Sequence, residues 1–316
     1  MKYLITGGAG FIGSSLAKKL VDNGHEVTVI DDLSMGKKEN LDTEKVYFIK
    51  GDIRDNELME QVFEKTQFDY VFLLAAIASV ADSIQRPIET HEVNLDANLN
   101  ILKLIKEKQN DIKRVVFASS AAVYGDEPTL PKKENSQIKP LSPYAIDKFA
   151  SEQFVLLYNN LYGVPASVVR FFNVYGMNQN PESPYSGVLS IITDKFKQKL
   201  AGKDAVFNVY GDGNQERDFV FIEDVIQALM LVSESESSRG NVYNVGTGIA
   251  TSLNRIIEIY NDYFKISMKL NYLPSRDGDI RYSYADISSL QNLGYVPIYS
   301  IVKGIHSYLK KELENL

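Results

Sequence analysis

Residues 6–13 read TGGAGFIG, between a short apolar run and the start of a helical pattern. Gly7, Gly10 and Gly13 are three positions apart, and the stretch also matches the dinucleotide fingerprint GxGxxG. Glycines in this context allow a tight turn and bring backbone amides close to a pyrophosphate at a helix N-terminus. A glycine-rich turn without a ligand is the alternative, which the flanking strand and helix patterns disfavour. We therefore predict a dinucleotide site that includes Gly7, Gly10, Phe11, Ile12 and Gly13.

Repeated strand and helix patterns surround this stretch. Apolar runs rich in Val, Ile, Phe and Leu, as in strands buried on both faces, occupy residues 3–6, 27–30, 46–49, 70–74, 115–118 and 166–172. Helical patterns lie between them at residues 11–23, 56–66, 91–108 and 143–161. This alternation predicts an α/β fold with a Rossmann-like, doubly wound parallel sheet.

The pattern loosens after residue 172. Residues 173–186 predict a loop, a strand is expected at 241–245, and helices are expected at 188–200, 223–232, 253–264 and 301–313. The run SESESS at 233–238 is typical of a solvated loop, with a phosphorylation site as the alternative. We predict a smaller, interleaved C-terminal α/β substrate lobe. Residues 1–172, with about 219–245, would form the dinucleotide-binding domain, and residues 173–218 and 246–316 the lobe.

Composition excludes several functional classes. The 316 residues carry 34 Lys and Arg against 41 Asp and Glu, a formal net charge of −7, so a nucleic-acid partner is not expected. There is no cysteine, and the three histidines are far apart in sequence, so neither disulfides nor a metal site are expected. No signal-peptide pattern or membrane-length apolar run occurs. We expect a cytoplasmic protein without a membrane partner.

Acidic residues follow the second and third predicted strands. Asp31 lies 18 positions after Gly13, where a carboxylate can accept both adenosine ribose hydroxyls and repel a 2′-phosphate. Asp32 follows and no Arg is near, so NAD is favoured over NADP as cofactor. Asp52 and Ile53 follow the third strand, where the carboxylate could meet the adenine amino group; a simple Gly-Asp turn is the alternative.

A Tyr-x-x-x-Lys pair opens a predicted helix. Tyr144 and Lys148 share one helix face, after a Ser-Pro start signal. A nearby ammonium lowers the pKa of a phenol, which makes a usable acid or base near neutrality. Ser120 ends the fifth strand, at the edge where such folds bind ligands. A capping serine and a surface Tyr–Lys pair are the alternatives. We predict that Ser120, Tyr144 and Lys148 form a proton-transfer set for interconverting an alcohol and a ketone.

Seven segments together give a family resemblance: TGGAGFIG, LLAAIASV, SSAAVYGD, SPYAIDK, RFFNVYG, GDGNQERDF and RDGD. In this order they resemble the extended short-chain dehydrogenase/reductase family, and within it nucleotide-sugar 4-epimerases of the UDP-galactose 4-epimerase type. The resemblance implies that NAD stays bound and that Tyr144 takes the proton of the sugar 4-hydroxyl while C4 gives a hydride to the nicotinamide. It also implies that the 4-keto sugar rotates before the hydride returns to its other face.

The resemblance also implies the remaining site residues. Those assigned to the cofactor site are Leu74, Ala75 and Ala76, with Tyr144 and Lys148. Those assigned to the UDP-sugar are Ser79, Asn94, Ser120, Asn173, Val188, Asn208, Arg217, Arg276 and Ser283. The arginines suit a diphosphate because a guanidinium can bind two of its oxygens.

Sequence differences from related enzymes narrow the set of reactions expected for this chain. Ala121 and Ala122 stand where dehydratases and decarboxylases of this family carry acidic residues. Ser283 matches a wall position that is a bulky Tyr in epimerases restricted to non-acetylated sugars. We therefore expect C4 epimerisation of UDP-GlcNAc and UDP-GalNAc, with UDP-Glc and UDP-Gal as further substrates. A UDP-uronic-acid 4-epimerase and a non-catalytic NAD-binding protein are the alternative functions. For Ser283 itself, the alternative is a small packing residue without a role in substrate choice.

The resemblance finally implies a homodimer. Two predicted helices, at residues 91–108 and 143–161, carry apolar residues beyond one face. In the family, such helices pair in a four-helix bundle between two subunits. The apolar residues that would contribute are Phe149, Phe154, Leu157 and Leu161.

Overall fold

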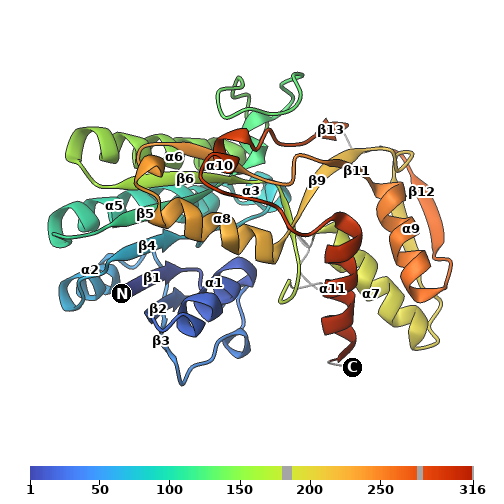
Figure 1. The fold of residues 1–316 in the computed structure, drawn as a ribbon, viewed down its shortest axis with the longest axis horizontal. Coiled ribbons are helices and arrows are strands. Elements are labelled where there is room, and N and C mark those ends of the chain that lie inside the picture. The colour runs from blue at the N-terminus through green and yellow to red at the C-terminus, as the bar shows by residue number, and fades with distance from the viewer. Residues whose placement is uncertain (180–186, 276–279, 315–316) are drawn as a thin grey trace.

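A parallel sheet organises the first half of the chain in the computed structural model, which describes residues 1–179, 187–275 and 280–314 (Figure 1). Its seven strands have the order β10-β6-β5-β4-β1-β2-β3, and every neighbouring pair is parallel. The strands are β1 (Lys2–Thr6), β2 (Glu26–Asp31), β3 (Val46–Lys50), β4 (Tyr70–Leu73), β5 (Arg114–Ser120), β6 (Ala166–Phe171) and β10 (Val242–Val245). The predicted doubly wound fold is confirmed, because the strand order reverses direction next to β1.

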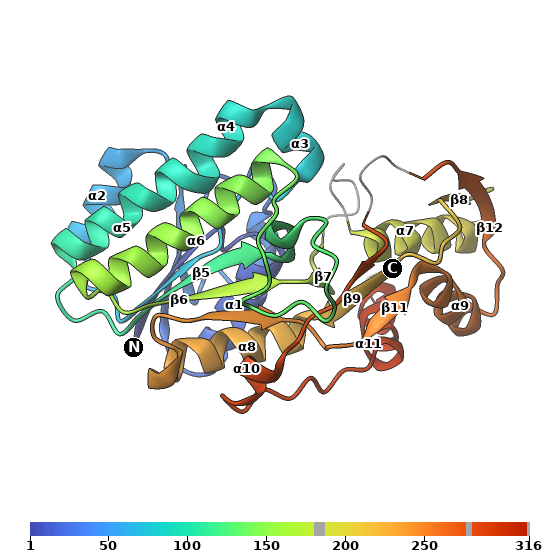
Figure 2. The ribbon, with the colours of Figure 1, turned by 90° about the horizontal axis from the view of Figure 1, so that it is seen from above.

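Helices cover both faces of this sheet (Figure 2). One face carries α2 (Asn56–Lys65), α3 (Val80–Gln85), α4 (Pro87–His91), the π-helical turn η2 (Glu92–Asp96), α5 (Ala97–Lys108) and α6 (Pro143–Tyr162). The other carries α1 (Phe11–Asp22) and α8 (Ile222–Glu234), which contact each other. Short 3-10 turns lie at η1 (Lys38–Asn40), η3 (Ala121–Tyr124) and η4 (Glu236–Ser238).

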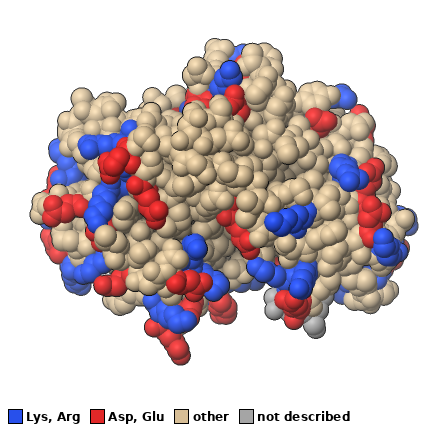
Figure 3. All heavy atoms as spheres, viewed as in Figure 1, with Lys and Arg blue, Asp and Glu red and all other residues tan. Residues whose placement is uncertain are grey.

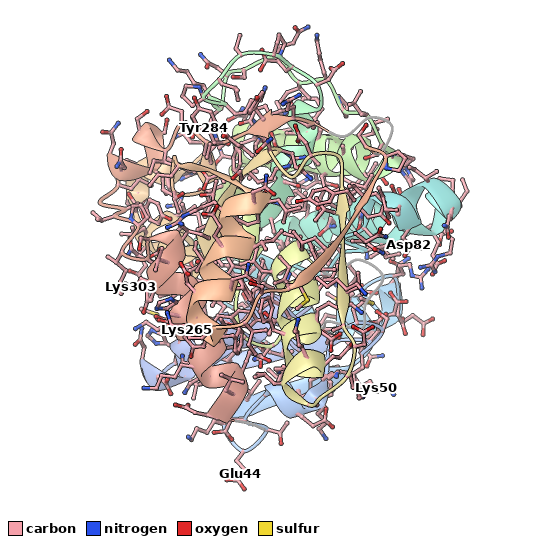
Figure 4. The ribbon with its side chains drawn as sticks, turned by 90° about the vertical axis from the view of Figure 1, so that its right-hand side faces the viewer. Glu44, Lys50, Asp82, Lys265, Tyr284 and Lys303 are labelled. Carbon is pink, nitrogen blue, oxygen red and sulfur yellow. The ribbon has the colours of Figure 1, made fainter. Side chains whose placement is uncertain are left out.

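A second group of elements forms a smaller lobe beyond the carboxyl ends of the large sheet (Figures 1 and 2). One small sheet joins β7 (Asn173–Tyr175), β9 (Glu216–Phe221), β11 (Ala250–Ser252) and β13 (Tyr282–Ser283). Another pairs β8 (Val206–Tyr210) with β12 (Lys269–Leu273). The lobe helices are α7 (Val188–Leu200), α9 (Leu253–Phe264) and α11 (Ile301–Glu314). Figure 4 views this end, with Lys265 after α9 and Tyr284 after β13.

The apolar core is continuous between the large sheet and the lobe. One cluster joins residues of α1 and β2 to residues of α7, α8, α9 and α11. A separate cluster fills the other face, between the sheet and helices α2, α5 and α6. Burial of this extent stabilises the fold by removing apolar surface from water. The core of the lobe is therefore continuous with the core on the sheet face that carries α1 and α8.

One expectation about the C-terminal half is corrected. Residues 173–175 are strand β7, not loop, because they pair in parallel with β9. The helix α10 (Ser288–Gln291) contacts β10 of the large sheet. The remainder of the expected 173–186 loop lies partly outside the described residues.

The serine-rich run at 233–238 is also not a simple solvated loop. Ser233 and Ser238 are buried, and the Ser238 hydroxyl donates to the Val232 carbonyl at 2.6 Å. Ser167 of β6 donates to the Ser238 carbonyl at 2.8 Å. These two hydroxyls therefore anchor the end of α8 to the sheet.

Surface charge is mixed on the face seen in Figure 3, where Lys and Arg side chains alternate with Asp and Glu around a broad neutral centre. Within the described residues, no helix has the length and apolar character that a membrane crossing needs.

Candidate active site

The glycine-rich turn connects the end of β1 to α1 and touches the end of β4. The Gly7 amide donates to the Ile30 carbonyl of β2 at 2.8 Å. The Thr6 hydroxyl, which sequence reasoning did not single out, accepts from the amides of Leu74 and Ala75 at 3.2 Å each. These bonds fix the turn against two neighbouring strand ends.

Two of the glycines are required by geometry. Gly7 has φ of +69°, and a Cβ there would lie 2.7 Å from the Cα of Ala75. A Cβ at Gly13 would collide with the backbone of Gly7 and Gly8. Gly10 is the N-cap of α1 and has no side chain to bond the first helical amides. The amides at the start of α1, including those of Phe11 and Ile12, are therefore open to an anionic group.

Asp31 ends β2 with its carboxylate beside this turn. One oxygen accepts from the Ala9 amide at 2.9 Å and the other from the Leu33 amide at 2.8 Å. Burial raises the pKa of Asp31, while these two hydrogen bonds oppose the rise. Each oxygen keeps a lone pair, so the carboxylate can still accept from ribose hydroxyls.

Asp52, which is expected to contact adenine, is paired with a neighbouring arginine. Arg54 engages both carboxylate oxygens, with Nη2 at 2.7 Å and Nε at 3.0 Å from Oδ2, and its amide also donates to Oδ1 at 2.8 Å. This pairing lowers the pKa of Asp52. Asp52 is therefore paired with Arg54, and its contact with adenine stays a prediction, while the neighbouring Ile53 is buried.

Two residues expected to contact the sugar nucleotide hold the segment after β4, which includes Ala76. Ser79 is the N-cap of α3, and its hydroxyl accepts from the Asp82 amide at 2.9 Å. Asn94 is fully buried; its Oδ1 accepts from the Ile77 amide at 2.9 Å and its Nδ2 donates to the Ile77 carbonyl at 3.1 Å. Both polar atoms of Asn94 bind the backbone of Ile77, and its contact with the sugar nucleotide stays a prediction.

Ser120, Tyr144 and Lys148 meet at the carboxyl end of β5. The Ser142 hydroxyl caps α6 by accepting from Ala145 at 3.2 Å, which starts the helix at Pro143, one residue before Tyr144. Ser120 acts on the Tyr144 phenol and lowers its pKa. The Lys148 ammonium donates to the Ala118 carbonyl of β5 at 2.9 Å. Ser120 also accepts from the Ala122 amide at 3.2 Å, so it combines capping with its contact to Tyr144.

The electrostatics of this set differ from the expectation in one respect. Burial raises the pKa of Tyr144, and the hydrogen bond with Ser120 is the influence that opposes it. Burial also lowers the pKa of Lys148 to about 7. Lys148 is not among the influences on the pKa of Tyr144, so the expected lowering of that pKa by Lys148 is not found.

A buried polar network beneath the site was not anticipated. Ser119 donates to Glu152 of α6 at 3.0 Å, and the Nε of Arg170 on β6 donates to the same carboxylate at 3.0 Å. Arg170 also donates to the Tyr124 hydroxyl at 2.8 Å, which in turn donates to Asn244 at 2.6 Å. The only sequence signal is a charged residue inside the apolar run 166–172. The network locks β5, β6, β10 and α6 together.

The expected sugar and phosphate contacts fall on two small sheets. Arg217 of β9 is in register with Ser283 of β13, and its Nη1 donates to the Glu216 carbonyl at 2.9 Å. Asn173 begins β7 and is exposed, opposite Phe219 of the same β9. One sheet thus brings Asn173, Arg217 and Ser283 together.

The other expected contacts are placed apart or not described. Asn208 lies on β8 of the second small sheet and accepts from Asn271 at 3.0 Å. Val188 is the half-buried first residue of α7. Arg276 lies outside the described residues.

A buried carboxylate that sequence reasoning missed supports the Arg217 sheet. Asp218 accepts from the Thr247 hydroxyl at 2.7 Å, from the Gly248 amide at 2.9 Å and from the Ala285 amide at 3.2 Å. It ties β9 to the segments on either side. The contacts come from residues distant in sequence, so no local signal predicts them.

The model of the NAD dependent epimerase/dehydratase family matches residues 3–246. This chain belongs to that family. The family assignment agrees with the resemblance to extended short-chain dehydrogenase/reductase proteins, makes the chain an enzyme, and makes NAD its cofactor.

Three similar proteins cover nearly the whole chain. A putative UDP-glucose 4-epimerase of Methanocaldococcus jannaschii is 37% identical over 303 residues, 96% of this chain and 95% of the relative. The UDP-glucose 4-epimerase of Thermotoga maritima, solved with UDP-glucose, is 34% identical with a TM-score of 0.93, over 100% of this chain and 99% of the other. The UDP-N-acetylglucosamine 4-epimerase of Methanobrevibacter ruminantium M1, in complex with UDP-N-acetylmuramic acid, is 36% identical with a TM-score of 0.91 over the same shares.

The residues of the epimerase/dehydratase chain fit the cofactor. The Gly7 turn and the open amides of α1 suit the pyrophosphate, and the Asp31 carboxylate suits the ribose. Lys148 and Tyr144 lie at the end of β5, two strands from β1 in the same sheet, where the nicotinamide half would extend.

Proposed function

We propose that the protein interconverts UDP-hexoses that differ at C4, through a transient 4-keto sugar and with NAD as a retained cofactor. The observation that carries this proposal is the convergence of Ser120, Tyr144 and Lys148 at one strand end of an NAD-binding sheet. A hydroxyl, a phenol and a buried amine in this arrangement suit proton exchange with an alcohol.

Each of these side chains has a separate task in the proposed reaction. NAD, when bound, accepts the hydride of C4 and returns it. Tyr144 takes the proton of the 4-hydroxyl and gives it back to the ketone oxygen. Ser120 donates a hydrogen bond to the same oxygen, which complements its contact with Tyr144. Lys148 holds the nicotinamide ribose.

We further propose that the lobe sheet binds the nucleotide sugar. Arg217 and Asn173 would hold the diphosphate, with Arg276 and Asn208 as further contacts, while Val188 and Ser283 would line the sugar pocket. The small side chain of Ser283 leaves room for a 2-N-acetyl group. This supports UDP-GlcNAc and UDP-GalNAc as substrates, together with UDP-Glc and UDP-Gal. Residues 1–172 and 219–245 would then hold NAD, and residues 173–218 and 246–316 the sugar nucleotide.

The substitution Tyr144→Phe tests the proposal. It removes only the phenolic oxygen, so kcat should fall by about 10² to 10⁴-fold while the protein still carries NAD, measured by nucleotide release on denaturation. Tyr47→Phe, at an exposed tyrosine of β3, is the matched control and should leave both properties unchanged. A Tyr144→Phe variant as active as the wild type would contradict the proposed chemistry.

A further inference from the structure

Helix α6 carries a buried carboxylate to which the proposed reaction gives no task. Glu152 lies eight positions after Tyr144 and four after Lys148, so the three side chains share the buried face of this helix. The side chain of Glu152 is 1% exposed. A carboxylate so far from water is costly unless its oxygens are bonded, so its presence in this helix calls for an explanation.

Glu152 binds two residues that lie side by side at the end of the large sheet. Ser119 of β5 donates to its Oε2 at 3.0 Å. Arg170 of β6, which is in register with Ser119, donates to Oε2 through Nε at 3.0 Å and to Oε1 through Nη2 at 2.5 Å. Both oxygens of the carboxylate are therefore bonded, at a point one residue before Ser120.

The same contacts reach the segment on the other side of Ser120. The remaining guanidinium nitrogen, Nη1 of Arg170, donates to the Tyr124 hydroxyl at 2.8 Å. Tyr124 is the last residue of the turn η3, which begins directly after Ser120. Ser120 thus lies between two bonded segments, and the bonds of both lead to Glu152.

Helix α6 runs alongside β5 and β6 (Figure 2). One turn before Glu152, Lys148 donates to the Ala118 carbonyl of β5 at 2.9 Å. Successive turns of α6 are therefore bonded to successive residues of β5, and Tyr144 lies one further turn towards the start of the helix. A shift of α6 along β5 would break the bonds of Glu152 and displace Tyr144 and Lys148 together.

We propose that Glu152 is a positioning residue, which holds α6 in register with β5 so that Tyr144 and Lys148 meet Ser120 in the geometry that the reaction needs. The inference rests on the proposed function, which gives these three residues their roles. Glu152 itself touches neither the sugar nor NAD in this account. A buried ion pair often adds no more stability than apolar side chains of similar volume, and fixing the register of neighbouring elements is a role that such a pair can serve.

Two variants test this role through kcat. Glu152→Gln keeps the size of the side chain but turns one oxygen into a donor that faces Arg170. The value of kcat should therefore fall by about 10- to 100-fold, the loss that a displacement of about 1 Å can cause. Ser119→Ala removes one bond and leaves the ion pair intact, so kcat should fall by less and Tm should stay close to the wild-type value. KM and NAD content should change little in both variants, because the proposed diphosphate and pyrophosphate sites lie on other elements.

Asp224→Asn is the matched control. Asp224 of α8 is also buried, and it accepts from the amides of Ile298 and Tyr299 at 3.0 and 3.1 Å, on the opposite face of the sheet from α6. Its substitution should lower Tm while kcat stays at the wild-type value, which separates loss of position from loss of stability. A wild-type kcat in both Glu152→Gln and Ser119→Ala would overturn the inference.

A second readout is structural and needs no substrate. In crystals of Glu152→Gln, the Nζ of Lys148 should lie beyond hydrogen-bond reach of the Ala118 carbonyl, at more than about 3.5 Å. Asp224→Asn should keep this contact at 2.9 Å. If the wild type turns over no UDP-sugar, the proposed function fails, and this distance still reports on Glu152. An unchanged contact in Glu152→Gln would also overturn the inference.

Discussion

Lys148 illustrates how the surroundings decide the chemistry of a single residue. Its ammonium donates to the Ala118 carbonyl and lies 4.9 Å from the centre of the Phe117 ring. These contacts compensate only part of the loss of water, since burial still lowers the pKa of Lys148 to about 7. The protein thus keeps a partly charged amine in its interior, at a cost in stability.

Replacement of this lysine should reveal that cost. The pKa of Lys148 is lower in the folded than in the unfolded protein, so the unfolded chain binds more protons between pH 7 and about 10. Wild-type stability should therefore rise with pH through this window. Lys148→Met should abolish activity but raise Tm at pH 6, with a gain that shrinks towards pH 9. Calorimetry measures this, with Lys133→Met, at an exposed lysine, as control. An equal effect at every pH would contradict the assignment.

Ser283 carries the proposed choice of sugar. Ser283→Tyr should lower kcat/KM for UDP-GlcNAc at least about tenfold relative to UDP-Glc, because a bulky side chain competes with the N-acetyl group for space. Ser283→Ala removes the hydroxyl without adding volume and should leave the ratio near that of the wild type. Competition assays with both sugars measure the ratio. Equal losses for both sugars in the Tyr variant would remove Ser283 from the account of specificity.

At this scale the sequence indicates residue types at strand ends, but not the partners of their polar atoms. Ser120 ends β5 and influences the pKa of Tyr144. Ser79 caps α3, Asn94 binds the Ile77 backbone, and Asp52 is held by Arg54. Each of these bonds depends on a local turn or a distant segment that the motif does not encode.

The element that positions the cofactor is the junction of β1 and α1. Gly7 approaches the backbone of Ala75 with a positive φ, and Thr6 ties the same two strand ends together. This close approach, not flexibility, explains the need for glycine. The glycine pattern between a strand and a helix predicts it from sequence, because the required backbone geometry is local.

Comparison of Gly7→Ala with Gly24→Ala should separate the effect of crowding at Gly7 from the effect of backbone strain. Gly24 also has a positive φ, of +81°, but a Cβ there meets nothing within 4 Å. Gly24→Ala should therefore cost only the strain, about 1–2 kcal/mol, with NAD content unchanged. Gly7→Ala should lower Tm further and reduce bound NAD. Thermal unfolding and nucleotide content measure both, and equal effects of the two variants would contradict the role of the close approach.

Helices and strands of this chain differ in how well local patterns predict them. Helices α7 and α9 have the predicted bounds, since both show strong apolar spacing. The helix expected at 91–108 is interrupted by η2, whose wider turn depends on Asn94 and its partners in other segments. Strand β7 forms because it pairs with β9, and residues 173–175 show no alternation of apolar and polar side chains that would predict a strand.

On the scale of the whole molecule, one apolar face remains to be explained. Ile146, Leu157 and Leu161 of α6 are exposed, at 53%, 43% and 64%, while Phe149 and Phe154 are half-buried. Apolar exposure of this kind on the face of a helix is typical of a subunit interface. We propose that α5 and α6 pair with those of a second copy in a four-helix bundle.

Disruption of this face should change the molecular mass in solution. The wild type should be a dimer at micromolar concentration, and Leu157→Asp should shift it to the monomer, because a buried unpaired charge is costly. Leu200→Asp, at an equally exposed leucine of α7, should leave the dimer intact. Light scattering measures the mass, and a monomeric wild type would contradict the proposed interface.

The interleaving of the two lobes is a global property that the sequence indicates only in part. The return of the chain to the large sheet through α8 and β10 follows from its apolar patterns. The contact of α10 with β10, and the bonds that Asp218 makes to segments 247–248 and 285, arise only after folding. They join parts of the chain too distant for local patterns.

The most direct test of the proposed epimerisation is product analysis by proton NMR of the purified protein, without added NAD, incubated separately with UDP-GlcNAc and UDP-Glc. The account predicts that UDP-GlcNAc is converted into UDP-GalNAc and that UDP-Glc also yields its C4 epimer. Turnover of UDP-Glc alone would contradict the assignment of the pocket at Ser283. No conversion of either sugar, even with NAD supplied, would contradict the proposed function itself.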